Sequence, residues 1–110
     1  MRASELEQQH LEMLKAIVTR SLANTPARAF IFGSWANGTA RGTSDIDIGV
    51  IGLRDIDSHT LDNLREELLE SDIPYFTEVV DFSKVSDDFK KIALSSTIEL
   101  VDNRNIGATD

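Results

Sequence analysis

The chain has 110 residues, no cysteine and a formal net charge of −8. This length suits one domain with a single modest core, and the lack of cysteine excludes disulfides and thiolate metal sites. The acidic charge argues against non-specific binding to nucleic acid and to anionic membranes. The N-terminus does not resemble a signal peptide, and no apolar run approaches the roughly 20 residues that cross a bilayer, so we expect a cytoplasmic protein.

The first part of the chain predicts a helix followed by a buried strand. Over residues 4–23 apolar side chains recur at three- and four-residue spacing, and Ser4 is a candidate N-cap. His10 lies on or beside this apolar stripe, and we interpret it as a packing residue rather than a catalytic one. Residues 28–32 are almost all apolar, which predicts a short central strand covered on both faces.

A turn with several glycines separates this strand from a second one. Residues 33–44 are predicted to form the turn, and residues 45–51 the second strand. Strand side chains alternate between faces, so Asp45 and Asp47 point to one side while the isoleucines between and after them face a core. Gly49 within this strand indicates close packing or a bulge.

The second half of the chain continues with alternating helices and strands. Residues 58–70 predict a helix capped by Asp57 or Ser58, residues 75–82 a strand, and residues 86–97 a helix capped by Ser86. The buried stripes of the two helices are predicted to be Leu61, Leu64, Leu68 and Leu69, and then Phe89, Ile92 and Ala93.

The predicted fold is α/β (α+β), a small mixed sheet with helices packed on one face. Residues 98–101 fit either a short edge strand or the frayed end of the preceding helix. Residues 1–102 are predicted to form the domain, and the polar residues 103–110 a flexible C-terminal tail.

The two carboxylates on the second strand need a physical explanation. Asp45 and Asp47 share one face of a mostly apolar strand, which is costly unless a cation neutralises them. Mg²⁺ with a substrate phosphate fits oxygen ligands of this kind, and two metal ions can neutralise both groups. Gly33 and Ser34 begin a tight turn whose successive amides suit phosphate oxygens. The stretch therefore predicts a site that binds nucleotide and transfers phosphoryl groups.

Gly33-Ser34, ten further residues and Asp45-Ile46-Asp47 together resemble the signature of the DNA polymerase β-like nucleotidyltransferase superfamily. The stretch GSWANGTARGTSDIDIGV is similar to the minimal nucleotidyltransferases, and the resemblance extends over roughly residues 10–101. It implies transfer of a nucleoside monophosphate to a hydroxyl, with ATP as the expected substrate. Gly33 and Ser34 would bind its phosphates, and Asp45 and Asp47 would bind two Mg²⁺ ions.

The family pattern includes a third carboxylate that binds metal and can accept the proton of the acceptor hydroxyl. Glu78 stands where the family usually has aspartate, and Asp81 is the alternative. These residues are three apart, so in a regular strand they face opposite sides. We favour Glu78.

Two positions in the glycine turn are less well defined. Trp35 replaces an arginine that often follows the Gly-Ser pair, and it fits either packing beneath the turn or stacking on a base or a partner. Arg41 is a cation in the same loop that fits either contact with the triphosphate or a solvated position.

The resemblance also suggests what accepts the nucleotide. Minimal nucleotidyltransferases of the MntA-like group are antitoxins that pair with helical HEPN-class proteins and transfer AMP to a tyrosine of the toxin. This implies that the chain is a protein adenylyltransferase that forms a hetero-complex with a HEPN-type protein. Two alternatives remain open: an enzyme acting on a small molecule, and a domain that binds nucleotide or partner without catalysis.

Overall fold

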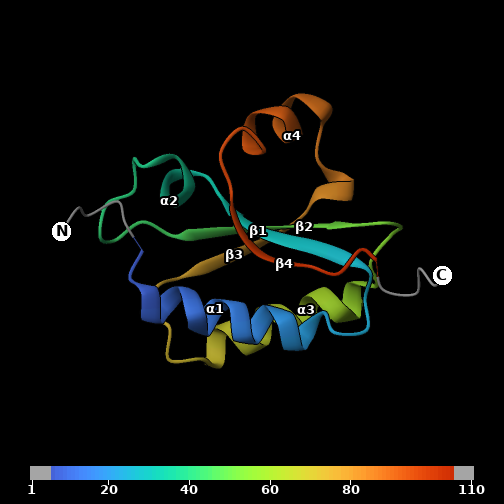
Figure 1. Cartoon of the computed structure of the whole chain (residues 1–110), viewed down its shortest axis with the longest axis horizontal. Helices are drawn as coiled ribbons and strands as arrows, with labels where there is room; N and C mark the ends of the chain where they lie inside the picture. The colour runs from blue at the N-terminus through green and yellow to red at the C-terminus, as the bar shows by residue number, and fades with distance from the viewer. Residues whose placement is uncertain (1–5, 106–110) are drawn as a thin grey trace.

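The computed structural model describes residues 6–105 as a four-stranded mixed sheet with helices (Figure 1). The strand order is β3-β2-β1-β4, with β1 antiparallel to both β2 and β4, and β2 parallel to β3. In chain order the elements are α1 (Gln8–Ser21), β1 (Ala27–Phe32), α2 (Ser34–Asn37), β2 (Ile46–Gly52), α3 (Ser58–Glu70), β3 (Thr77–Asp81), the 3₁₀ helix η1 (Phe82–Lys84), α4 (Asp87–Ala93) and β4 (Ile98–Asp102). The predicted fold class is confirmed.

The larger core lies between the sheet and the two long helices, which run along one face of the sheet (Figure 1). Side chains of β1 and β2 that alternate toward this face, among them Ile31 and Ile48, are fully buried against α1 and α3. The Asp57 side chain accepts a hydrogen bond from the His59 amide at 3.0 Å and so caps α3. Helix α1 begins at Gln8, with Glu7 at its N-cap, and the proposed cap Ser4 lies outside the described residues.

A smaller, aromatic core lies on the opposite face of the sheet. Phe30, Phe82 and Ala93 are buried there, beneath η1 and α4. Helix α4 therefore lies on the face of the sheet opposite to α1 and α3 (Figure 1). The prediction that the helices pack on one face is wrong for α4, because the aromatic side chains of β1 on this side must also be covered. A Cβ atom at Gly49 would lie 2.6 Å from the rings of Phe30 and Phe82, so the predicted close packing is confirmed.

Three large apolar side chains that the helical spacing placed on buried stripes are exposed. Leu69 is 77% exposed on α3, and Phe89 and Ile92 are 43% and 75% exposed on α4. Sequence spacing shows which residues share a helix face but not how much of that face the neighbouring elements cover, and within residues 6–105 these three side chains are left largely uncovered.

Near the C-terminus the structure shows whether residues 98–101 form a strand or the end of the preceding helix. Residues 98–101 belong to strand β4, which pairs with β1 at the sheet edge. In the predicted tail, Asn103 is held to the domain by two hydrogen bonds, from the Ala27 amide at 2.9 Å and to the Leu22 carbonyl at 2.7 Å. Residues 106–110 lie outside the described residues. Within residues 6–105, no helix has the length and apolar character required to cross a membrane.

Candidate active site

The parallel pairing of β2 and β3 brings two of the predicted site residues together. Asp47 is in register with Glu78, so both side chains lie on the same face of the sheet, and Asp45 immediately precedes β2. Burial raises the pKa of Asp47, and the negative charges of Glu78 and then Asp45 raise it further. Glu78 and Asp45 are therefore both close enough to repel the Asp47 carboxylate, and a cation would relieve this repulsion.

Asp81 lies elsewhere. It is in register with Val50, whose side chain points to the opposite face, toward α1 and α3. Its carboxylate accepts hydrogen bonds from the Ser83 amide at 2.9 Å and the Ser83 hydroxyl at 2.8 Å, which caps η1. The prediction that Glu78 and Asp81 face opposite sides is confirmed, and only Glu78 lies beside Asp47.

Gly33 lies against the Asp47 side chain. Its backbone has φ +77°, a region that side chains disfavour, and a Cβ atom there would lie 2.5 Å from Oδ2 of Asp47. The segment predicted as a plain turn contains the one-turn helix α2, which Ser34 begins. The Ser34 carbonyl accepts hydrogen bonds from the amides of Gly38, Thr39 and Ala40 at 3.0–3.1 Å, which closes the loop. Strand β1, the loop and the carboxylates thus meet at Gly33.

Replacing Gly33 with alanine is expected to destabilise the fold. The new methyl group must displace the Asp47 side chain and adopt a disfavoured backbone region, at a combined cost of about 2–5 kcal/mol. Gly38 is a control for positive φ alone, because it has φ +86° in the left-handed helical region and a Cβ atom there would meet nothing within 4 Å. Gly33 has ψ −149°, in a region nearly restricted to glycine, so its own backbone strain adds to the contact with Asp47. Urea denaturation of Gly33→Ala and Gly38→Ala therefore compares the combined loss at Gly33 with the smaller strain at Gly38. Equal losses in the two variants would show that the approach to Asp47 is unimportant.

The structure decides between the two interpretations of Trp35. The side chain is only 4% exposed, its Nε1 donates to the Ser44 carbonyl at 3.0 Å, and its ring packs against Tyr75 with centroids 5.3 Å apart. Trp35 therefore supports the loop from beneath and is too buried to stack on a base. His10 also packs against Tyr75, with ring centroids 5.5 Å apart, as the packing interpretation predicts.

Arg41 is exposed on the same loop. Its backbone amide donates to the Ser44 hydroxyl at 2.9 Å, which orders the turn before Asp45. Within residues 6–105 its guanidinium makes no hydrogen bond or ion pair. Contact of Arg41 with a triphosphate thus stays a prediction.

Magnesium fits the donor set of the cluster. Within residues 6–105, no three His, Cys, Asp or Glu side chains are arranged to hold a metal ion by themselves. Mg²⁺ does not require such a cage, because proteins commonly bind it through one or two carboxylates while water and substrate phosphate supply the other ligands. Asp45, Asp47 and Glu78 provide only oxygen donors. Burial raises the pKa of Asp47 most, the charges of Glu78 and Asp45 raise it further, and a bound cation would offset all three effects.

An apolar hollow of about 280 Å³ adjoins Gly33, and we call it the Gly33 pocket. The exposed Phe89 and Ile92 of α4 line it, and two serines lie at its edge. No sequence motif marks these residues as functional, and their one signal in the sequence is that Phe89, Ile92 and Ala93 give this short helix a wide apolar stripe. The full lining is Phe32, Gly33, Asn37, Phe89, Ile92, Ala93, Ser95 and Ser96.

Comparison with known protein families shows which family has this sequence pattern. Residues 12–106 match the family described as Polymerase beta, Nucleotidyltransferase. The chain belongs to this family. Among curated proteins it is similar to a Haemophilus influenzae protein described as "Probable protein adenylyltransferase MntA", with 30% identity over 80% of this chain and 75% of the relative.

Solved structures of the family share the fold. A chain of the complex of tri-AMPylated Shewanella oneidensis HEPN toxin with MNT antitoxin aligns with a TM-score of 0.61 at 18% identity, covering 94% of this chain and 78% of that one. A toxin-antitoxin crystal structure with AMP-PNP aligns with a TM-score of 0.59 at 22% identity, covering 86% and 77%. At these identities the likeness shows the nucleotidyltransferase fold.

Proposed function

We propose that this nucleotidyltransferase transfers AMP from ATP to a tyrosine hydroxyl of a HEPN-type partner protein and so acts as its antitoxin. The observation that carries the proposal is the meeting of Gly33, Asp45, Asp47 and Glu78 at one place in a chain 30% identical to a protein described as an adenylyltransferase. The HEPN complexes among the structures that share the fold support the choice of partner.

In the proposed reaction the acceptor oxygen forms a bond to the α-phosphorus of ATP. The bond from this phosphorus to the bridging oxygen breaks, and pyrophosphate leaves with its electron pair. Glu78 lies in register with Asp47, in a position to accept the proton that the acceptor hydroxyl loses. Asp45 and Asp47 would hold Mg²⁺, which when bound offsets the charge of the phosphates. Gly33 and Ser34 would hold the triphosphate through the backbone amides of the turn.

Intact-mass spectrometry of the partner tests this proposal. The HEPN-type protein is purified alone and after co-expression with this chain. We expect a mass gain of one or more AMP units only after co-expression, and fragmentation of the modified peptide should assign it to a tyrosine. A stable complex without any mass gain would instead indicate a domain that binds and blocks its partner without catalysis.

The nucleoside of ATP is proposed to occupy the Gly33 pocket, which is apolar and continuous with the turn. Removing the exposed Ile92 side chain, as Ile92→Ser, is expected to raise the Kd for Mg·ATP about three- to tenfold through lost apolar contact. Leu53→Ser is the control, because Leu53 is similarly exposed at 65% but lies outside the pocket. Tripolyphosphate, which has no nucleoside, should bind both variants and the wild type equally. An unchanged Kd for ATP in Ile92→Ser would place the nucleoside elsewhere.

A further inference from the structure

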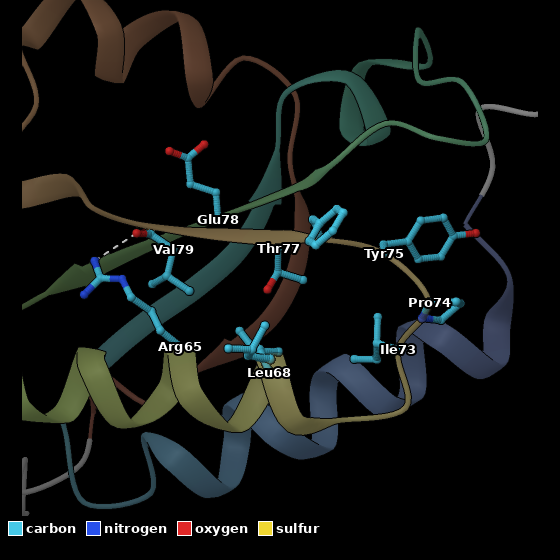
Figure 2. Close-up of a pocket in the computed structure, with 10 residues that line it drawn as sticks. Arg65, Leu68, Ile73, Pro74, Tyr75, Thr77, Glu78 and Val79 are labelled. Atoms are coloured by element: carbon cyan, nitrogen blue, oxygen red, sulfur yellow. Dashed lines mark hydrogen bonds between the residues drawn. The ribbon is translucent and has the colours of Figure 1, made fainter.

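A groove of about 730 Å³ lies along the edge of the sheet between α3 and β3, and Figure 2 shows its lining. We call it the α3–β3 groove. Its floor includes Leu68, Ile73 and Val79, and Glu78 lies on its rim. In Figure 2, Glu78 projects from β3 on the side opposite to Thr77 and Val79, which point toward α3. A molecule that lies along this edge therefore touches both the groove and the carboxylate cluster.

The groove carries exposed apolar side chains that the domain does not cover. Phe76 is 78% exposed and Leu69 is 77% exposed, and both line the groove. The Phe76 carbonyl accepts a hydrogen bond from the Ile46 amide at 2.9 Å, so the extended pairing with β2 already begins there. Because Phe76 is two residues before Glu78, the alternation of an extended chain directs the two side chains to the same face. An aromatic contact surface thus lies beside the proposed proton acceptor.

The backbone of β3 is partly blocked as a docking edge. Strand β3 is the last strand on its side of the sheet, so its outer edge has no strand partner within the sheet. Nη2 of Arg65 donates to the Val79 carbonyl at 3.0 Å, in the middle of that edge, while Nη1 binds Asp62 at 2.9 Å. This contact opposes pairing by an added strand, so a partner would bind the groove through its side chains.

Helix α3, which forms one wall of the groove, is acidic on its exposed face. It carries four exposed carboxylates, of which Asp62 pairs with Arg65 and Glu67 with Arg20. Glu66 and Glu70 are four residues apart and so lie on the same side of the helix, outside the groove lining. A complementary partner would present an apolar side chain within a basic surface, which is the character of a protein that binds RNA phosphates.

We infer that the α3–β3 groove is the docking surface for the protein that supplies the acceptor hydroxyl. The partner places apolar side chains against Leu69 and Phe76, sets basic residues against Glu66 and Glu70, and so brings its hydroxyl to Glu78. This inference rests on the proposed function for the nature of the partner. It adds the surface, the side-chain mode of binding and the basic character of the partner's contact region.

The test measures binding and AMP transfer separately, with the HEPN-type proteins of the source organism purified as probes. In Leu69→Ser/Phe76→Ser we expect the Kd for the partner to rise at least tenfold while the Kd for Mg·ATP is unchanged. Leu53→Ser controls for the loss of an exposed apolar side chain outside the groove. Glu66→Lys/Glu70→Lys should weaken the complex about tenfold, whereas Glu12→Lys/Asp55→Lys, with the same charge change elsewhere, should not.

The outcomes keep this inference distinct from the proposed function. A groove variant that binds the partner as tightly as the wild type overturns the inference, and so does an equal loss in the groove variants and their controls. A wild-type complex that is lost in the groove variants but never transfers AMP supports the docking surface and contradicts the proposed catalysis. Absence of any complex between the wild type and these proteins also overturns the inference.

Discussion

Replacement of Asp45 and Asp47 together by asparagine is expected to reduce AMP transfer at least about 10³-fold. Each amide has nearly the shape of the carboxylate but lacks its charge, so the site would lose the ligands proposed for Mg²⁺, an ion worth several kcal/mol in the transition state. Transfer is measured by the mass of the partner protein. Glu12→Gln/Asp55→Asn is the control, because it removes two exposed carboxylates away from the site.

The same variant should remain folded. Burial and the neighbouring carboxylates raise the pKa of Asp47 in the fold, so ionised Asp47 opposes folding at neutral pH. This cost in folding free energy is absent below the pKa that Asp47 has in the unfolded chain, and it appears as the pH rises through the higher pKa that Asp47 has in the folded protein. Without metal, the asparagine variant should therefore melt at the same temperature as the wild type or higher at pH 7. Full AMP transfer by the folded variant would refute the proposed metal site.

Glu78→Gln is expected to lower AMP transfer about 10²- to 10⁴-fold, because glutamine cannot accept a proton from the acceptor hydroxyl. Asp81→Asn should leave transfer within about threefold of the wild type, because Asp81 faces the other side of the sheet. Its effect should instead appear in stability, at about 0.5–2 kcal/mol, through weaker capping of η1. Single-turnover transfer and urea denaturation measure the two effects.

The opposite pattern of activities would make Asp81, and not Glu78, the third carboxylate of the site. If Asp81→Asn lost transfer while Glu78→Gln kept it, the register of β2 and β3 would not identify the third carboxylate. The affinity for Mg·ATP in Glu78→Gln further separates proton transfer from metal binding. A role in proton transfer alone predicts an unchanged affinity.

The sequence predicted most elements of the fold because their signals are local. Alternation in residues 45–51 and the apolar spacing of residues 58–70 gave a strand and a helix close to their observed bounds. Ends and short elements were less accurate. Helix α1 begins four residues later than predicted, and α2 was missed because one helical turn in a glycine-containing loop leaves no periodic pattern.

The position of the candidate site also follows largely from local sequence. Gly33 and the Asp45–Asp47 pair lie close in the chain, and the hairpin of β1 and β2 brings them together. The choice between Glu78 and Asp81 could not be made from local sequence with the same certainty. It depends on which residues of β3 pair with β2, a contact between segments about 30 residues apart in the sequence.

By itself the sequence determined the fold class, the family resemblance and the pairing of Asp45 with Asp47 on one face of a strand, because each depends on residue type and short spacing. Only the tertiary structure decided that Trp35 packs beneath the loop and that Glu78 rather than Asp81 lies beside Asp47. It also showed that Leu69, Phe76 and Ile92 remain exposed beside the α3–β3 groove and the Gly33 pocket. The physical reason is that an apolar side chain is buried only where another element covers it, and that cover depends on how distant segments pack.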